Sequence, residues 1–255
     1  MEDRTTAIAD LFADARQQRS PSDSSTAPRS PFPLSLDTAA LLEIHSQTVD
    51  APPPVAFFGV YDGHGGTAVA EALQQDLHHL IVKNGLQGDP KQALEQACLE
   101  MDKACLARDH ELSAPPPGTS EDAEDQPRRQ SLLTKMELSG ATAAMALVLR
   151  GRDDACVRVY AANVGDSRVV LSCGGEALDL TRDHTFTHAA EKERVKTAGG
   201  VISRGRLNGV LEVTRSFGDI KCKTYPPPEG THLWGDKQSL VAKPDIEEVI
   251  CFVLH

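Results

Sequence analysis

The spacing of apolar positions divides the chain into a helical region and a later region of short strands. Residues 55–61, VAFFGVY, form a short apolar run rich in β-branched and aromatic side chains, which predicts a buried strand. In residues 67–83 and 92–112 the apolar side chains recur at helical spacing, so we predict two helices there. Apolar stripes of this kind usually face a protein core.

Beyond residue 139 the apolar runs shorten and alternate with turn-forming Gly and Asp, a pattern typical of antiparallel strands. One predicted helix, within residues 188–200, interrupts them, and extended segments resume in residues 201–219. The strands that we predict in this region cover residues 142–149, 157–163 and 168–172. Several antiparallel strands with two long helices inserted together indicate an α+β fold.

We expect one domain over residues 1–255, interrupted by two surface insertions. Residues 17–34 are dense in Ser and Pro, and residues 113–130 contain three consecutive prolines and a run of charges. Such compositions bury too little apolar area to offset the entropy of ordering, so we predict that both segments are flexible. An insertion without function is the simpler interpretation, and phosphorylation or partner docking at the Ser-Pro steps is the alternative.

Charge and cysteine content narrow the classes of partner and compartment. The net charge is −11, and the chain lacks the patterned Lys and Arg that grip nucleic-acid phosphates, so we expect no nucleic-acid partner. No apolar run is long enough to span a membrane, and the acidic start MED is unlike a signal peptide, so we expect no membrane partner. Six scattered cysteines without a CxxC pair indicate a reducing compartment, and we expect a cytoplasmic or nuclear protein.

The densest group of candidate catalytic residues is YDGHGG, residues 61–66, at the end of the predicted buried strand. Asp62 offers a carboxylate and Gly63 a carbonyl to a hard divalent cation, and the glycines allow close backbone approach. His64 is a candidate proton donor near neutral pH. A Gly-rich hairpin turn without chemistry explains the same residues, so this motif alone leaves both interpretations open.

Four further motifs change that balance. They are SGATA (139–143), ANVGDSR (162–168), EKERVKTAGGVI (191–202) and RLNGVLEVTRSFGD (206–219). Together with YDGHGG and the opening MED, they make the chain resemble the metal-dependent protein phosphatases of the type 2C (PPM) class. The resemblance covers residues 1–3 and 57–249, apart from the two insertions, and five motifs in one fixed order are not expected by chance.

The resemblance implies a β-sandwich of two antiparallel sheets flanked by helices. At one end of the sandwich it implies a centre of two Mn²⁺ or Mg²⁺ ions, with Asp62 bridging both, the Gly63 carbonyl on one, and His64 as the general acid. Such a metal pair acidifies a bridging water for attack on the phosphoryl group, and the leaving alkoxide needs the proton that His64 can give. The implied reaction is hydrolysis of phosphoserine and phosphothreonine in phosphoprotein substrates, by a protein that we expect to be a monomer.

By the same resemblance, Glu2 and Asp3 hold metal-bound waters and Asp166 belongs to a third, weaker metal site. We therefore expect the carboxylates of Asp3, Asp62 and Asp166 to converge in one pocket, because hard-cation sites need clustered oxygens. Other matched positions are framework residues, for which hydrogen bonding of loops and strands is the better explanation: Asp183, His184, Asn208, Gly209, Arg215 and Asp219.

The chain departs from the family pattern at both ends and, in a small way, at Ala141, where Ser, Thr or Cys is usual. It starts at MED, without the preceding strand and its phosphate-gripping Arg, and it stops at His255, before the Asp-Gly and Asp-Asn motifs that each supply a metal-binding carboxylate. We therefore expect a C-terminally incomplete domain with little activity by itself, because carboxylate charge sets most of the metal affinity. The alternatives are a catalytically inactive or truncated member acting as a binding or regulatory module, and a metal-binding structural domain without a substrate.

Overall fold

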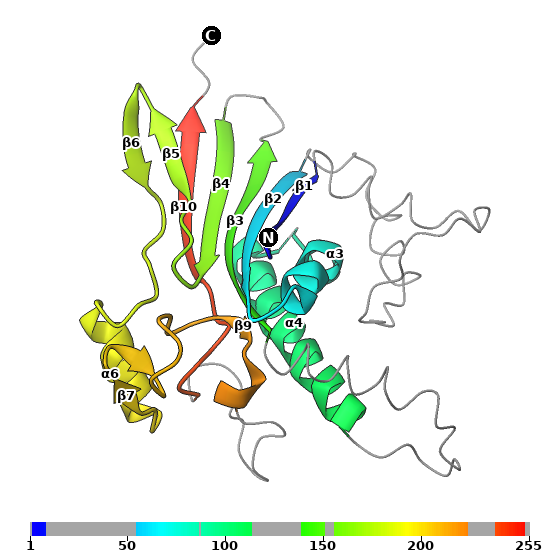
Figure 1. The fold of residues 1–255 in the computed structure, drawn as a ribbon. Coiled ribbons are helices and arrows are strands. Elements are labelled where there is room, and N and C mark those ends of the chain that lie inside the picture. Colours follow the sequence, from blue (N-terminus) through cyan, green and yellow to red (C-terminus); the bar gives the residue numbers. More distant parts are fainter. Residues whose placement is uncertain are drawn as a thin grey trace, which may run out of the picture.

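The computed structural model describes residues 2–8, 55–86, 88–113, 139–150, 156–223 and 238–252. Its main feature is an antiparallel sheet with two long helices on one face (Figure 1). The strand order is β1-β2-β3-β4-β10, and the short β9 pairs with β3. These strands are β1 (Arg4–Ile8), β2 (Val55–His64), β3 (Gly140–Arg150), β4 (Cys156–Val164), β9 (Phe217–Gly218) and β10 (Asp245–Phe252).

Side-chain alternation along β2 decides which face of the sheet is covered. Phe57 and Tyr61 are fully buried, whereas Phe58 and Val60 are 46% and 50% exposed on the other face. Two helices, α3 (Ala68–Lys83) and α4 (Pro90–Ser113), cover the first face. They complete the core with the buried side chains of Val69, Leu73, Leu77, Ile81, Leu94 and Met101. Burying one such side chain stabilises the fold by about 1.5–3 kcal/mol, so apolar packing fixes β2 in place.

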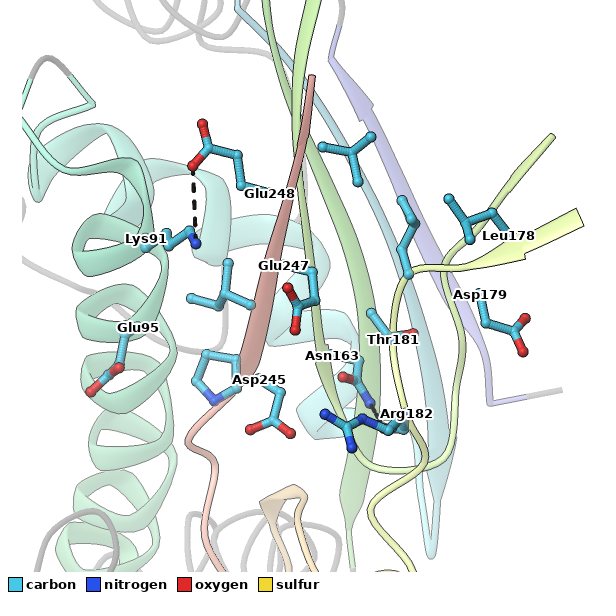
Figure 2. Close-up of a pocket in the computed structure, with 14 residues that line it drawn as sticks. Lys91, Glu95, Asn163, Leu178, Asp179, Thr181, Arg182, Asp245, Glu247 and Glu248 are labelled. Atoms are coloured by element: carbon cyan, nitrogen blue, oxygen red, sulfur yellow. Dashed lines mark hydrogen bonds and ion pairs between the residues drawn. The ribbon is translucent and has the colours of Figure 1, made fainter. Parts of the chain in front are cut away.

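A hairpin forms a further layer beside the sheet. It consists of β5 (Val170–Cys173) and β6 (Glu176–Asp179), which pair only with each other. Figure 2 shows the chain after β6 on one side of β10 and α4 on the other. The arrangement of helices, antiparallel sheet and hairpin confirms the predicted α+β class.

We call the chain between Ala189 and Gly218 the α6–β9 segment: α6 and β7 lie below the sheet in Figure 1, and β9 pairs with β3 at its lower end. The segment contains α6 (Ala189–Thr197), β7 (Ile202–Ser203), β8 (Arg206–Leu207) and β9, and the 3-10 turn η1 (Ile220–Cys222) follows. The apolar cluster of this region has three buried members, Val195, Leu207 and Leu240. Apolar packing alone is therefore a small part of what holds the segment together.

Most predicted elements are confirmed, with ends shifted by a few residues: the helices at 67–83, 92–112 and 188–200 and the strands at 55–61, 142–149, 157–163 and 168–172. Strands β1 and β10 were not predicted from the sequence, because they are short or rich in Thr, Asp and Glu. The predicted insertion at 17–34 lies outside the described residues, as does that at 113–130 except for Ser113, the last residue of α4. No helix among the described residues is long and apolar enough to cross a membrane.

Candidate active site

The pairing of β1 with β2 brings the MED motif to the end of β2. Arg4 lies opposite Tyr61 in the antiparallel register, so Glu2 and Asp3 run alongside the residues that follow Tyr61. A Cβ atom added to Gly63 would lie 2.6 Å from the Glu2 carbonyl oxygen. Glycine at position 63 therefore lets the two backbones approach closely, as the motif analysis expected.

Two carboxylates from distant parts of the sequence, those of Asp3 and Asp166, act on the carboxylate of Asp62. The side chain of Asp3 is in hydrogen-bonding contact with that of Asp62, and Asp166, in the bend that follows β4, is close enough for its charge to act on Asp62. Partial burial of Asp62 raises the pKa of its carboxyl group, and the negative charges of Asp3 and Asp166 raise it further. The charges of Asp3 and Asp166 thus act on Asp62 in the structure, and a cation would relieve this repulsion.

His64 is the last residue of β2, and its ring lies against the carboxylate of Asp219, the residue that follows β9. The Nε2 atom is 2.8 Å and 2.9 Å from the two carboxylate oxygens. The hydrogen bond to Asp219 raises the pKa of His64 above its usual value, although burial of the ring acts in the opposite direction. The negative charges of Asp62 and Glu2 also raise the pKa of His64, so His64 lies close enough to both carboxylates to be affected by them.

Two features make room for the His64–Asp219 pair. A Cβ on Gly140, opposite His64 in β3, would overlap both the Asp219 carboxylate and the His64 ring, so only glycine fits. Asp219 adopts a left-handed backbone with φ of 50°, and Ser216 donates a hydrogen bond of 2.5 Å to its Oδ2 atom. Non-glycine residues seldom adopt this conformation, and such strain is concentrated at functional sites.

The donor set suits a hard divalent cation, because two carboxylates in hydrogen-bonding contact cannot both be ionised cheaply without one. Asp62 is the side chain best placed to bind such an ion, with Asp3 and Asp166 beside it. Within the described ranges, however, no three His, Cys, Asp or Glu side chains gather closely enough to hold one ion by themselves. The described residues therefore do not form a complete metal site by themselves.

Comparison with known proteins decides the family. A family model described as "Protein phosphatase 2C" matches residues 33–251. The chain belongs to the protein phosphatase 2C family. The sequence is 32% identical over 217 residues to "Protein phosphatase 2C homolog 2" of Aspergillus flavus, covering 82% of this chain and 42% of that protein. It is 34% identical over 211 residues to a probable protein phosphatase 2C of Caenorhabditis elegans, covering 80% of this chain and 49% of that protein.

The fold agrees with this assignment. A crystal structure of a phosphatase from Toxoplasma gondii superposes with a TM-score of 0.58 at 22% identity, covering 80% of this chain and 67% of that one. At this identity the likeness concerns the fold alone. The chain spans less than half the length of the two curated relatives named above.

In this protein phosphatase 2C chain, the predicted framework residues join the loop of Asp166 to the α6–β9 segment. His184 accepts a hydrogen bond from the Gly165 backbone N–H at its Nδ1 atom (3.1 Å), and its Nε2 lies 3.0 Å from an Asp245 carboxylate oxygen. Arg215 binds the other Asp245 oxygen at 2.8 Å. The prediction that His184 and Arg215 serve in hydrogen bonding is confirmed by these contacts.

A cavity of about 740 Å³ lies elsewhere, along β10 between α4 and the chain after β6 (Figure 2). Its acidic side chains are largely engaged in the framework: Glu248 faces Lys91 at 4.0 Å, and Asp245 is bound by Arg215 and His184. The hydrogen bond from His184 and the nearby Arg215 lower the pKa of Asp245, although burial opposes them. This cavity contains neither Asp62 nor His64, so we do not assign the chemistry to it.

The main feature that sequence reasoning missed is the direct contact of Asp219 with His64. The motif TRSFGD marked Asp219 only as a framework position, and a separation of 155 residues hides the pairing from any local pattern. The signal that could have found it is the glycine at position 140, since a side chain there would collide with the Asp219 carboxylate and the His64 ring.

Proposed function

We propose that this protein is a metal-dependent protein phosphatase that hydrolyses phosphoserine and phosphothreonine in phosphoprotein substrates. The observation that carries the proposal is the contact of Asp3 with Asp62 beside the His64–Asp219 pair, in a chain of the protein phosphatase 2C family. Two Mn²⁺ or Mg²⁺ ions, with a third and weaker site at Asp166, would supply an activated water and neutralise charge on the phosphoryl group.

The residues of this chain have separate tasks in the proposed reaction. Asp62 and the Gly63 carbonyl would hold the metal ions directly, while Glu2 and Asp3 would orient water around them. His64 donates a proton to the leaving Ser or Thr oxygen, and Asp219 fixes the orientation of its ring through the contacts at 2.8 Å and 2.9 Å.

Mn²⁺ titration by calorimetry, combined with turnover of a phosphoserine peptide, tests these tasks. Asp62→Asn should abolish both Mn²⁺ binding and turnover. His64→Gln should leave Mn²⁺ binding intact and slow the peptide about 10²-fold or more, while sparing p-nitrophenyl phosphate, whose leaving group needs no proton. The exposed Asp179 of β6 supplies the control Asp179→Asn, which should match the wild type. Full turnover by Asp62→Asn would contradict the proposed metal site.

A catalytically inactive binding module is the second candidate, and the incomplete ligand set of the described residues favours it. The two candidates predict different effects of a C-terminal extension on Mn²⁺ binding and turnover. If the protein is a phosphatase whose centre needs further carboxylates, a chain extended through an Asp-Gly and an Asp-Asn motif should bind Mn²⁺ more tightly and turn over faster. A binding module would retain phosphopeptides without hydrolysis in both lengths.

We also propose a monomeric protein of the cytoplasm or nucleus, without a nucleic-acid or membrane partner. All six cysteines are free thiols, which suits a reducing compartment. Light scattering of the purified chain at several concentrations tests the monomer, and a mass that rises with concentration would contradict it.

A further inference from the structure

A second cavity, of about 470 Å³, adjoins the loop that carries Asp166. Asp166 forms part of its wall, and the charge of Asp166 reaches Asp62. The β7–β8 hairpin, with Arg204 at its tip, also lines the cavity, and Phe186 contributes a partly buried aromatic surface. A peptide bound with its phosphorylated residue at Asp62 would extend along this cavity.

Some of the charged side chains that line the cavity have ion-pair partners, and Arg204 has none among the described residues. Asp183 accepts two hydrogen bonds from Arg168, at 2.6 Å and 2.7 Å, and Glu212 is paired with Arg206. Arg204 has no such partner: within the part of the chain that the structure describes, its exposed guanidinium forms no hydrogen bond or ion pair. The cavity is therefore negative at the end near the metal centre, through Asp166, and positive at the hairpin tip.

The backbone at Arg204 is strained. Ser203 and Arg206 are paired across the hairpin, so Arg204 and Gly205 form its two-residue turn, with φ of 54° and 75°. Such turns need two consecutive left-handed residues and favour Asn-Gly, whereas a long side chain in this conformation costs about 1–2 kcal/mol. A strained residue whose charge is unused within the fold points to a role in binding.

We propose that Arg204 forms a substrate subsite that binds a carboxylate, that of a Glu or Asp side chain close to the phosphorylated residue. The planar guanidinium can bind a carboxylate through two parallel hydrogen bonds, which a lone lysine cannot do. Asp166 repels an acidic residue at the other end of the cavity, so the preference applies to one side of the phosphorylated residue. This subsite rests on the proposed phosphatase function, because it places the phosphorylated residue at Asp62.

Fluorescence anisotropy with the full chain in Mn²⁺ tests the subsite without requiring turnover. The probes are matched phosphoserine peptides that carry Glu, Gln or Lys at one flanking position, first on one side and then on the other. The wild type should bind the Glu peptide about threefold to fivefold more tightly than the Gln peptide on one side only, and high salt should remove the difference.

Variants of the hairpin tip make the test specific. Arg204→Asn suits the left-handed turn, so it should fold at least as well as the wild type and lose the preference for Glu over Gln. Arg204→Lys should keep part of the preference for Glu over Gln. The control Arg150→Asn changes an exposed arginine at the opposite end of β3 from Gly140 and should keep all of it.

The outcomes separate this inference from the function on which it rests. Equal affinities for the Glu and Gln peptides in the wild type, no measurable binding, or an unchanged preference in Arg204→Asn would overturn the subsite. Failure of Mn²⁺ to support hydrolysis of p-nitrophenyl phosphate, even in an extended chain, would count against the phosphatase and not against binding by Arg204.

Discussion

Apolar packing holds the half of the molecule around α3 and α4, whereas charged side chains hold the α6–β9 segment. In the first half, Phe57 and Leu73 are completely buried in a large apolar cluster. In the second, the Glu191 carboxylate accepts hydrogen bonds from Arg194, Arg215 and Thr214, the last at 2.6 Å. Apolar burial is insensitive to pH, while paired charges are lost when a partner is neutralised, so the two halves should respond differently to the same stress.

The candidate site lies where these halves meet. Asp62 and His64 belong to β2, which the apolar core supports, whereas Asp219 and Arg204 belong to the charged part of the chain. The contact between His64 and Asp219 joins the two. The proposed metal centre would therefore rest on the apolar half, and the proposed substrate preference would depend on the half that charged side chains hold.

The largest expected effect is on the apolar half. Leu73→Ala removes a side chain with no exposed surface from α3 and should lower the free energy of unfolding by about 3–5 kcal/mol, since the surrounding core cannot close the cavity fully. Urea unfolding followed by circular dichroism measures the loss. A loss below about 1 kcal/mol would mean that this core is less tightly packed than the structure shows.

A smaller and more local effect is expected in the charged half. Glu191→Gln removes the charge that Arg194 and Arg215 share and should cost about 3 kcal/mol, because the two arginines lose their common partner. Hydrogen exchange should show faster opening of α6 and β9 with little change in β2 and β3.

The matched control is Glu193→Gln, which alters an exposed carboxylate on the same helix and should change neither quantity. If Glu191→Gln loosened β2 as much as α6, the two halves would unfold as one unit and the comparison would fail.

The same contrast explains what the sequence could predict. Asp62 and His64 were found because they come directly after the apolar run of residues 55–61, so the local pattern alone marks the end of β2. Glu191 and Glu193 look alike in EKERVKT, yet only Glu191 is buried, and only its partners Thr214 and Arg215 explain that. Contacts between residues far apart in sequence leave no periodic trace.

Strand β1 was missed for a similar reason. RTTAI has five residues, two of them threonines, and becomes a strand because β2 offers a free edge in register from Arg4–Tyr61 to Ile8–Phe57. The tertiary pairing supplies what the local propensity does not. That pairing also brings Asp3 to Asp62, so the carboxylate contact could be expected from the family resemblance but not from the residues themselves.

The smallest expected effect concerns acid pH and isolates Glu191. Burial acts to raise the pKa of Glu191, but hydrogen bonds from Arg215 and Thr214 outweigh it and lower the pKa from 4.5 to about 2. Between these values the unfolded state binds more protons than the folded state, so the stabilisation from Glu191 is complete well above pH 4.5 and declines as the pH falls toward 2. From pH 7 to pH 4 the loss should be about 1 kcal/mol. Because Gln does not titrate, the difference in unfolding free energy between the wild type and Glu191→Gln should shrink by this amount over that range, measured by urea unfolding at pH 7, 5 and 4. A difference that stays constant with pH would show that Glu191 is not held as a charged group in the folded protein, and that the α6–β9 segment owes its geometry to something other than charge.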